Sequence, residues 1–347
     1  MSFNRPHTFF CIGVRGGAKS SFLEAIGQYY LEKGHSLLDL FGSRDGEGLG
    51  WLRSPYATYK KILLVHGESV SVTAPCDTKA TTKVSLSDFE KYDIVISASP
   101  LYLGPDDEFI NAGLLTDKIY KRLSYKRLVY CLCREAANLF YSRLKISESQ
   151  VVSKAMMTYL VKEARHMSMA LGLDSTRFYS IDIDIRNLSD FIILKSQGMT
   201  GLTSDLTWLY SIFEPSMIRN MPPQFFIILS KEGSVGLGEF KEIPWHKQER
   251  ENILKAVGVR VEYGEPVEKG EYRGAFKTVG DLEHADIVKM YMDEGLSLNK
   301  IAEKIGRSSR TPFKHIHQHN SKVEGAGFCP ACRRVKSNLD KTLARRK

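Results

Sequence analysis

The feature that most constrains this 347-residue chain is a glycine-rich segment near its start, Gly13-Val14-Arg15-Gly16-Gly17-Ala18-Lys19-Ser20. An apolar run from His7 to Ile12 precedes it, and a helix-like stretch from Ser21 to Ile26 follows it. This order predicts a buried strand that leads through a tight loop into a helix. Such a loop turns backbone N–H groups and the positive end of the helix toward a bound polyphosphate.

We therefore predict a nucleotide site here, with ATP and Mg²⁺ as cofactors. Lys19 would contact the β- and γ-phosphates, and the Ser20 hydroxyl would ligate Mg²⁺. The usual motif has glycine where this chain has Ala18, which adds a Cβ close to the phosphates. The competing interpretation is a strand-to-helix turn that binds no nucleotide. The expected nucleotide-binding residues are Gly13, Val14, Arg15, Gly16, Gly17, Ala18, Lys19, Ser20 and Ser21.

Apolar runs alternate with amphipathic segments along most of the chain, which predicts an α/β fold with a mostly parallel sheet. Helices are expected at Ser21 to Lys33, where Gly34 would end the helix, and at Gln150 to His166. The expected strands are Thr8 to Gly13, His35 to Phe41, Lys61 to His66, Tyr92 to Ser97, Lys126 to Cys133, Met169 to Asp174, Phe191 to Lys195 and Gln224 to Leu229.

Nucleotide hydrolysis also needs an acid for Mg²⁺ and a carboxylate that activates water. Glu135 follows the apolar run Leu128 to Cys133 and is the candidate catalytic carboxylate; the alternative is that it only caps a helix. Arg134 occupies the position where an acid would hold the metal, and a guanidinium cannot do so. Asp39 or Asp174, at the ends of neighbouring expected strands, would then serve Mg²⁺, or Arg134 would contact phosphate or another subunit.

The segment from Asp39 to Gly50 holds four glycines and three acids. It is either a mobile loop near the phosphates or a solvated turn.

Glu163 to His166, Ala170 to Arg177 and Ile181 to Ile192 together resemble a region of the FtsK/HerA-type DNA-pumping ATPases, including their packaging and Zot-like relatives. The resemblance covers about residues 7 to 230 and implies a P-loop NTPase core. It implies that Lys19 and Ser20 form the phosphate-loop pair and that Glu135 is the catalytic acid. It further implies a sensor region and a following basic position at Thr176, Arg177 and Arg186. Ala18, Arg134 and the absence of the usual sensor Gln depart from the family pattern.

The net charge of +9 is concentrated toward the C-terminal end. Residues 281 to 347 contain fourteen Lys and Arg against eight Asp and Glu. This excess indicates a polyanionic partner, and double-stranded DNA is the expected one. The alternative is a solvated basic tail.

A helix-turn-helix is expected within this basic region. Ser297 would cap a short helix ended by Gly306, and Pro312 fits only the first turn of the helix that follows. This layout resembles the helix-turn-helix of resolvases and many transcription regulators, and a three-helix bundle for protein contacts is the alternative. The expected DNA-binding residues are Ser308, Ser309, Arg310, Thr311 and Lys314.

A Cys-x-x-Cys pair, Cys329 and Cys332, follows His315, His317 and His319. His317 and His319 with the two cysteines make a tentative tetrahedral Zn²⁺ set, in which His315 is an alternative to His317. The competing interpretations are a free thiol pair and a half-site completed by another subunit.

The other cysteines lie within apolar runs or alone, which favours reduced thiols in a cytoplasmic protein. We see no apolar stretch of about 18 residues and no secretory signal pattern, so no membrane contact is expected.

These patterns predict four parts: a P-loop NTPase domain (1–230), a connector (231–280), a small all-α helix-turn-helix domain (281–322) and a basic tail with the Cys-x-x-Cys (323–347). The expected function is that of an enzyme, an ATPase that couples ATP hydrolysis to the movement or remodelling of DNA. The protein is expected to assemble as a homo-oligomer. One alternative is an ATP-responsive DNA-binding regulator with little or no hydrolysis. Another is a structural DNA-binding protein whose P-loop is vestigial.

Overall fold

The computed structural model describes residues 5–42, 45–120, 127–141, 148–164, 166, 168–248, 251–264, 281–306, 310–326 and 329. The chain divides into two compact units, Met1–Lys269 and Gly270–Lys347. Within the described ranges, no helix combines the length and the apolar character that crossing a bilayer requires.

The first unit is built on a ten-stranded sheet with the order β11-β10-β9-β1-β8-β7-β2-β6-β3-β5. Neighbouring strands are parallel from β5 to β9, and β10 and β11 continue the sheet in antiparallel pairing. β4 and β12 form a separate antiparallel pair. The strands are β1 (Thr8–Ile12), β2 (Ser36–Phe41), β3 (Ile62–His66), β4 (Val70–Thr73), β5 (Asp77–Ala80), β6 (Ile94–Ala98), β7 (Val129–Arg134), β8 (Met169–Ser175), β9 (Phe191–Leu194), β10 (Phe225–Ser230), β11 (Val235–Glu239) and β12 (Arg260–Tyr263).

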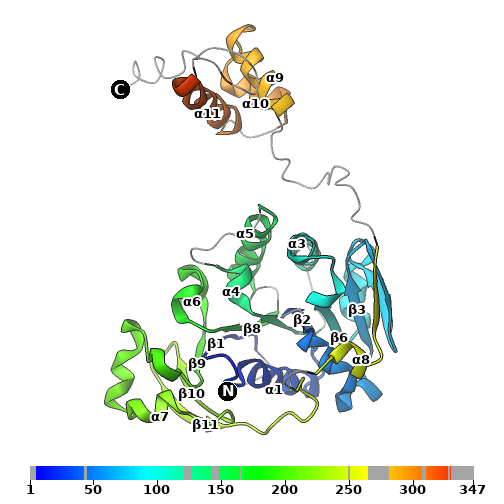
Figure 1. Ribbon diagram of the computed structural model, residues 1–347, viewed down its shortest axis with the longest axis vertical. Coiled ribbons are helices and arrows are strands. Elements are labelled where there is room, and N and C mark those ends of the chain that lie inside the picture. The colour runs from blue at the N-terminus through cyan, green and yellow to red at the C-terminus, as the bar shows by residue number, and fades with distance from the viewer. Residues whose placement is uncertain are drawn as a thin grey trace. The chain divides into compact units, whose positions relative to one another are not determined.

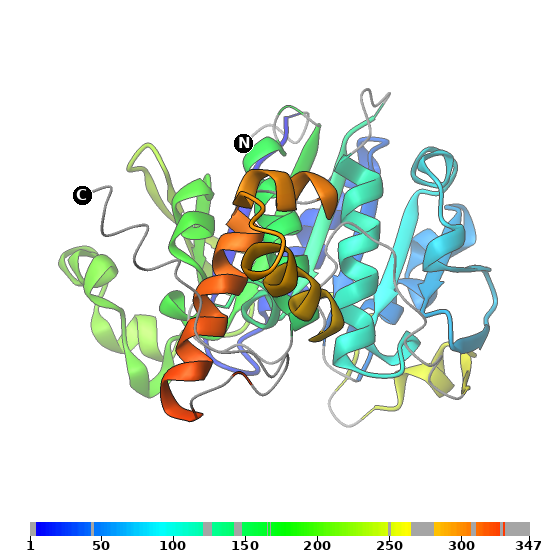
Figure 2. The same ribbon diagram turned by 90° about the horizontal axis from the view of Figure 1, so that it is seen from above.

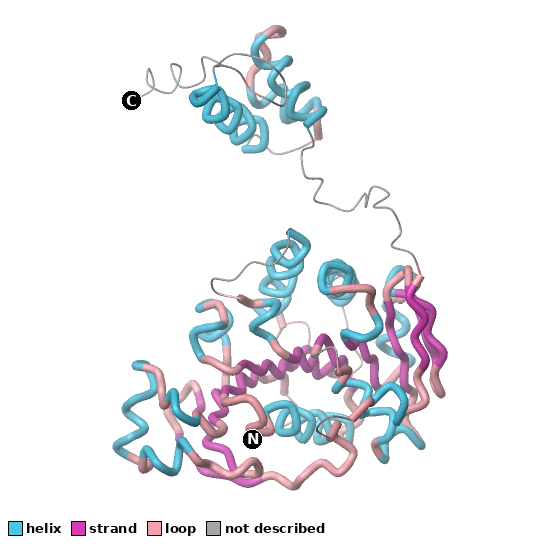
Figure 3. The backbone as a smooth tube through the Cα atoms, viewed as in Figure 1, coloured by secondary structure: helices cyan, strands magenta, loops and turns pink. Residues whose placement is uncertain are grey.

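Helices cover both faces of the sheet. Helix α1 lies on one face, and α3, α4, α5 and α6 lie on the other, where α3 is seen in front of the strands in Figure 2 (Figures 1 and 2). Figure 3 shows the strands as one continuous magenta row between these helix layers. The α-helices of this unit are α1 (Lys19–Glu32), α2 (Leu86–Lys91), α3 (Pro105–Tyr120), α4 (Ala136–Leu139), α5 (Glu148–Glu163), α6 (Ile183–Leu188), α7 (Pro215–Arg219) and α8 (Ile253–Ala256). Short 3-10 helices are η1 (Glu47–Arg53), η2 (Pro55–Thr58), η3 (Thr81–Lys83), η4 (Ser99–Leu101), η5 (Phe178–Ser180), η6 (Gly198–Thr200) and η7 (Ser204–Ser211).

The central strands are buried on both faces because their side chains point alternately into two separate hydrophobic clusters. In β1, Phe10 packs with residues of α3 and α5, whereas Phe9 packs with residues of α1. The expected turn after α1 is present, since Gly34 has a φ of +81°. The parallel α/β architecture expected from the sequence is therefore confirmed for this unit.

Residues 231–264 belong to the first unit, although the sequence suggested a connector here. β11 extends the main sheet, and β12 pairs with β4. Trp245 and Ile253 are buried in the hydrophobic cluster beside α1. The glycines and prolines of this segment punctuate short elements, so they do not mark a linker.

The second unit contains α9 (Asp281–Met292), α10 (Leu298–Lys304) and α11 (Arg310–Ala326). Ser297 accepts a hydrogen bond from the Lys300 N–H, and Gly306 has a φ of +65°, so both expected ends of α10 are confirmed. Pro312 lies in the first turn of α11, as expected. Among the described residues of this unit, the hydrophobic cluster has the buried members Ile287, Val288, Met290, Ile301 and Ile316.

Candidate functional site

The loop between β1 and α1 packs against the residues at the end of β9. A Cβ at Gly13 would lie 2.7 Å from the Cβ of Lys195, so only glycine fits there. The Val14 N–H donates to the Ser196 carbonyl at 2.8 Å. The Gly17 N–H donates to the Val14 carbonyl at 3.1 Å, which closes a turn within the loop. These contacts hold the loop against the sheet at the carboxyl ends of its parallel strands.

Two loop residues adopt the left-handed backbone conformation. Gly16 has a φ of +77° and Ala18 a φ of +56°. Alternation of left-handed and right-handed residues forms a concave nest of N–H groups, which suits an anion. An alanine in this conformation costs about 1 kcal/mol relative to glycine. Ala18 therefore adopts a backbone conformation that favours glycine, at the cost of some strain.

The N-terminus of α1 opens directly onto this loop. No side chain caps the helix at Ala18, and its first N–H groups have no carbonyl one turn before them. The ammonium group of Lys19 donates to the Val14 carbonyl at 3.0 Å. Lys19 thus folds back over the loop, close to where phosphate oxygens would lie against these N–H groups.

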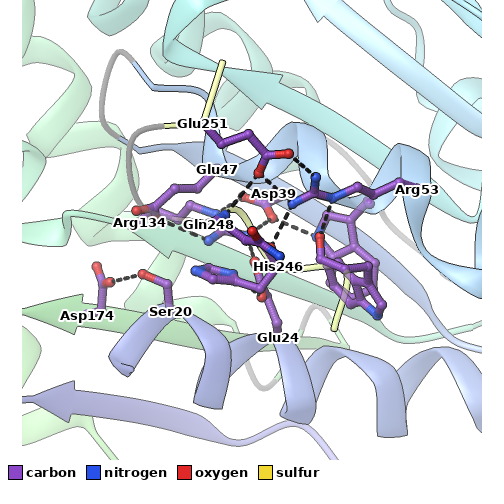
Figure 4. Close-up of polar contacts among 12 residues, drawn as sticks. Ser20, Glu24, Asp39, Glu47, Arg53, Arg134, Asp174, His246, Gln248 and Glu251 are labelled. Carbon is purple, nitrogen blue, oxygen red and sulfur yellow. Dashed lines mark hydrogen bonds and ion pairs between the residues drawn. The ribbon is translucent and has the colours of Figure 1, made fainter. Parts of the chain in front are cut away.

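Ser20 and Asp174 meet beside the loop. The Ser20 hydroxyl donates to the Asp174 carboxylate at 3.1 Å (Figure 4). Asp174 lies near the end of β8, which pairs directly with β1. Burial raises the pKa of Asp174 to about 6, and the nearby charge of Glu135 adds to this increase. A hydroxyl beside a carboxylate at a helix N-terminus is a suitable oxygen pair for Mg²⁺.

Glu135 lies directly after β7 and is exposed to solvent. Its backbone is left-handed, with a φ of +48°, and its N–H donates to Asp174. Among the described residues, Ala18, Phe41 and Glu135 are non-glycine residues with positive φ that follow or end central strands of the sheet. Strained backbone of this kind often accompanies function, and here Ala18 lies in the loop itself while Glu135 contacts Asp174 beside it.

Arg134, the last residue of β7, is fully buried. Its guanidinium donates to both oxygens of Asp39, at 2.8 and 2.7 Å, and to Glu24 at 2.6 Å. Asp39 also accepts from the Trp51 indole at 2.8 Å. The sequence predicts Asp39 as a Mg²⁺ ligand, but both of its carboxylate oxygens accept hydrogen bonds from Arg134, and one also accepts from Trp51. The acid that the structure places beside Ser20 is Asp174.

The buried ion pairs extend to the segment before α8. Glu24 on α1 contacts His246 at 2.7 Å as well as Arg134 (Figure 4). Burial by itself raises the pKa of Glu24, but the charges of Arg134 and His246 outweigh it, so the pKa is lowered. Sequence reasoning missed Glu24 and His246, because 222 positions separate them and neither belongs to a local motif.

The Asp39 to Gly50 segment forms a turn and the start of η1, in which Gly48 and Gly50 are buried. A Cβ at Gly48 would lie 3.1 Å from a carboxylate oxygen of Asp39. Among its described residues, this segment is thus packed against the ion-pair network.

Thr176 and Arg177, the expected sensor region, are exposed immediately after β8. Arg186 lies on α6, where its guanidinium stacks 4.8 Å from the Phe178 ring centre and 4.9 Å from that of Tyr179. These three expected residues follow the strand that carries Asp174. The side chain of Arg186 is held by these ring contacts, whereas the backbone of Arg177 exchanges hydrogen bonds with the Ser175 hydroxyl.

The expected DNA-binding residues lie at the start of α11. Arg310 and Lys314 are exposed and one helical turn apart, and Thr311 is half-buried. Ser308 and Ser309 lie outside the described residues. The exposed positive charges on one helix face suit contact with a phosphate backbone.

The expected zinc ligands are only partly brought together. His319 and Cys329 are buried and converge with His284 of α9, which the sequence did not suggest. His317 is exposed, and its ring lies near Phe313 instead. Residues two apart on a helix face different directions, which explains why His319 joins this group and His317 does not. Cys332 lies outside the described residues.

Comparisons with known proteins find similar solved structures of limited likeness. No protein-family model matches the sequence, and no curated protein matches it. The genome packaging NTPase B204 of Sulfolobus turreted icosahedral virus 2, in complex with sulfate, is 15% identical with a TM-score of 0.40. The match covers 68% of this chain and 98% of that chain.

A second similar structure is Thermomonospora curvata EccC, its ATPases 2 and 3 in complex with a signal sequence peptide. It is 11% identical with a TM-score of 0.39, and the match covers 72% of this chain and 40% of that chain.

Proposed function

We propose that the first unit is an ATPase that uses Mg²⁺, with its nucleotide in the loop from Gly13 to Ser21. The observation that carries this proposal is the contact of Ser20 with the buried Asp174, directly beside the uncapped N-terminus of α1. A polyphosphate on the loop N–H groups would place its oxygens next to this pair. The hydroxyl and the carboxylate would hold Mg²⁺, directly or through water, and the metal supplies charge neutralisation at the phosphates.

Lys19 and Glu135 take the remaining roles. Lys19 would exchange its bond to the Val14 carbonyl for the phosphate oxygens, because an ammonium donates more strongly to an anion than to a neutral carbonyl. Glu135 is exposed at the end of β7 while its N–H contacts Asp174, so its carboxylate is positioned near the same site. It would orient and deprotonate the attacking water.

We assign double-stranded DNA as the partner of the second unit. The excess positive charge of residues 281–347 and the exposed pair Arg310 and Lys314 support this assignment. ATP turnover in the first unit would then act on DNA held by a helix-turn-helix made of α9, α10 and α11. Thr176 and Arg177, exposed after β8, are suited to contact a neighbouring copy in a homo-oligomer.

A second candidate function is an ATP-responsive DNA-binding protein with slow or no hydrolysis. One specific observation favours it: Arg134, which is committed to buried ion pairs, ends the strand that leads to Glu135. The strand that supplies the water-activating carboxylate therefore supplies no acid for the metal. The carboxylate that holds the metal, Asp174, and the carboxylate that activates water, Glu135, must then act from two different strands, β8 and β7.

Steady-state ATPase rates of the full chain, with and without double-stranded DNA, separate the two functions. Glu135→Gln should lower the rate by about 100-fold or more and leave ATP binding intact. Lys19→Ala should lower ATP affinity by at least about 10-fold, because an ion pair with phosphate is lost. Lys33→Ala, at the exposed C-terminal end of the same helix, is the control and should change neither quantity.

The outcomes are distinct. A wild-type protein that binds ATP but shows no turnover dependent on Glu135 would establish the second candidate. A wild-type protein that binds no Mg²⁺–ATP in calorimetry would exclude both.

A further inference from the structure

The second unit contains a buried cluster of three metal-ligating groups. The ligand atoms of His284, His319 and Cys329 lie within 4.8 Å of one another. The Cys329 sulfur is 3.6 Å from Nε2 of His284. The ring centres of His284 and His319 are 5.8 Å apart. We infer that these three side chains bind a structural Zn²⁺.

The spacing of the ligand atoms fits this metal. Tetrahedral Zn²⁺ with Zn–N near 2.0 Å and Zn–S near 2.3 Å holds its ligand atoms about 3.3–3.8 Å apart. The separation of the Cys329 sulfur and the His284 nitrogen lies in this range. Two imidazoles and one thiolate form a ligand set that favours Zn²⁺ over the oxygen-preferring Mg²⁺ and Ca²⁺.

The small core of this unit gives the metal a structural role. Among the described residues, the hydrophobic cluster of this unit has five buried members, which come from three short helices, and a domain of this size seldom folds on such a core alone. His284 belongs to the first turn of α9, His319 to the middle of α11, and Cys329 to the chain beyond α11. A metal bound here would therefore link the start of α9, the middle of α11 and the chain just beyond α11. Its binding free energy would add to the folding free energy of the unit.

The same arrangement holds the proposed DNA-contacting face. Arg310 and Lys314 precede His319 on α11, so fixing α11 against α9 also fixes the direction of these two exposed side chains. The zinc would not touch DNA, because its three ligands are buried. Its presence does not depend on the proposed nucleotide site in the first unit.

The test is metal analysis of the full-length protein, purified without a polyhistidine tag. We expect about one zinc per chain. His284→Ala and Cys329→Ser should each lose most of it, and His317→Ala, an exposed histidine on α11, should retain it. Cobalt exchanged into the wild-type protein should give the visible bands of a tetrahedral site and a thiolate charge-transfer band, and this readout requires no variant to fold.

Three results would overturn the inference. One is wild-type protein with no zinc above the buffer level. Another is a cobalt spectrum without a thiolate band. The third is zinc that survives His284→Ala but is lost in His317→Ala, since that would place the metal on the other face of α11. Because ATP plays no part in these measurements, their failure would leave the proposed ATPase untouched.

Discussion

Asp174 accepts a hydrogen bond from Ser20 although the two residues lie 154 positions apart in the chain. The contact exists because β8 pairs directly with β1, so the end of one strand and the loop after the other meet at the same edge of the sheet. Glu135 follows β7, the next strand along. The two acids of the candidate site therefore come from different strands, and each can be tested by itself.

Asp174→Asn should affect the binding of nucleotide, whereas Asp39→Asn should affect the stability of the fold. Asp174→Asn should weaken the binding of Mg²⁺–nucleotide by about 10- to 100-fold and keep the protein folded, because it removes a negative charge at the metal. Asp39→Asn should lower the free energy of unfolding by about 3 kcal/mol, because it leaves the buried Arg134 without its main partner. Titration with a fluorescent ATP analogue and urea denaturation measure the two quantities. Loss of magnesium-dependent binding in a stable Asp39→Asn protein would contradict this assignment.

The raised pKa of Asp174 makes the stability of the nucleotide-free protein depend on pH. Its pKa is about 6 in the folded protein and 3.8 in the unfolded chain, so the folded state binds this proton more tightly. The resulting stabilisation is complete below about pH 4 and is lost as the pH rises through about 6, a total of about 3 kcal/mol. Asp174→Asn does not titrate. Without Mg²⁺, the variant should gain stability relative to wild type between about pH 4 and pH 7.

Urea denaturation of both proteins across this range checks the prediction. A difference between the two unfolding free energies that stays constant with pH would show that Asp174 has an ordinary pKa.

Ala18→Gly should stabilise the loop or leave it unchanged, because glycine adopts the left-handed conformation without strain. The expected change in the free energy of unfolding is between zero and about +1 kcal/mol, since the added freedom of the unfolded chain offsets part of the gain. ATP affinity should not fall. Ala25→Gly, within the same helix α1, is the matched control and should destabilise by about 1 kcal/mol. Thermal denaturation compares the two, and equal losses would mean that Ala18 has a helical backbone.

Arg310→Ala and Lys314→Ala should each weaken the binding of double-stranded DNA to the full-length protein. Each change should lower the slope of log affinity against log salt by about 1, because one phosphate contact is lost. Fluorescence anisotropy with labelled DNA over a series of salt concentrations gives this slope. Lys33→Ala removes the same charge from α1 and should leave the slope unchanged. Variants of α11 that keep the wild-type slope would exclude it as the DNA-contacting helix.

The sequence predicted the buried strands well. All eight expected strands are present, because long apolar runs between turn residues are the signature of strands buried on both faces. The unexpected strands are short, contain few apolar residues and lie at the edges or outside the main sheet, such as Asp77–Ala80 and Val235–Glu239. Such strands form because a neighbouring backbone offers hydrogen bonds, and their own sequence carries little signal.

The site was predicted where its residues are close in sequence. The loop, Lys19 and Ser20 follow from one short motif, and the end of α10 follows from Ser297 and Gly306. The role of Arg134 depends on Glu24, which joins it only after α1 packs on the sheet. His284 precedes Cys329 by 45 positions, so no spacing rule connects it to the other candidate zinc ligands.

The inclusion of residues 231–264 in the first unit decides where this protein can be shortened. Cutting after residue 230, where the sequence suggests a boundary, would delete His246. One carboxylate oxygen of Glu24 would then lose its hydrogen bond to the His246 ring. It would also remove Trp245, whose ring packs against that of Trp51, and Glu251, which accepts hydrogen bonds from Arg53. A fragment that ends at residue 264 keeps all of these partners, and it is the shorter form in which we expect the isolated first unit to remain folded.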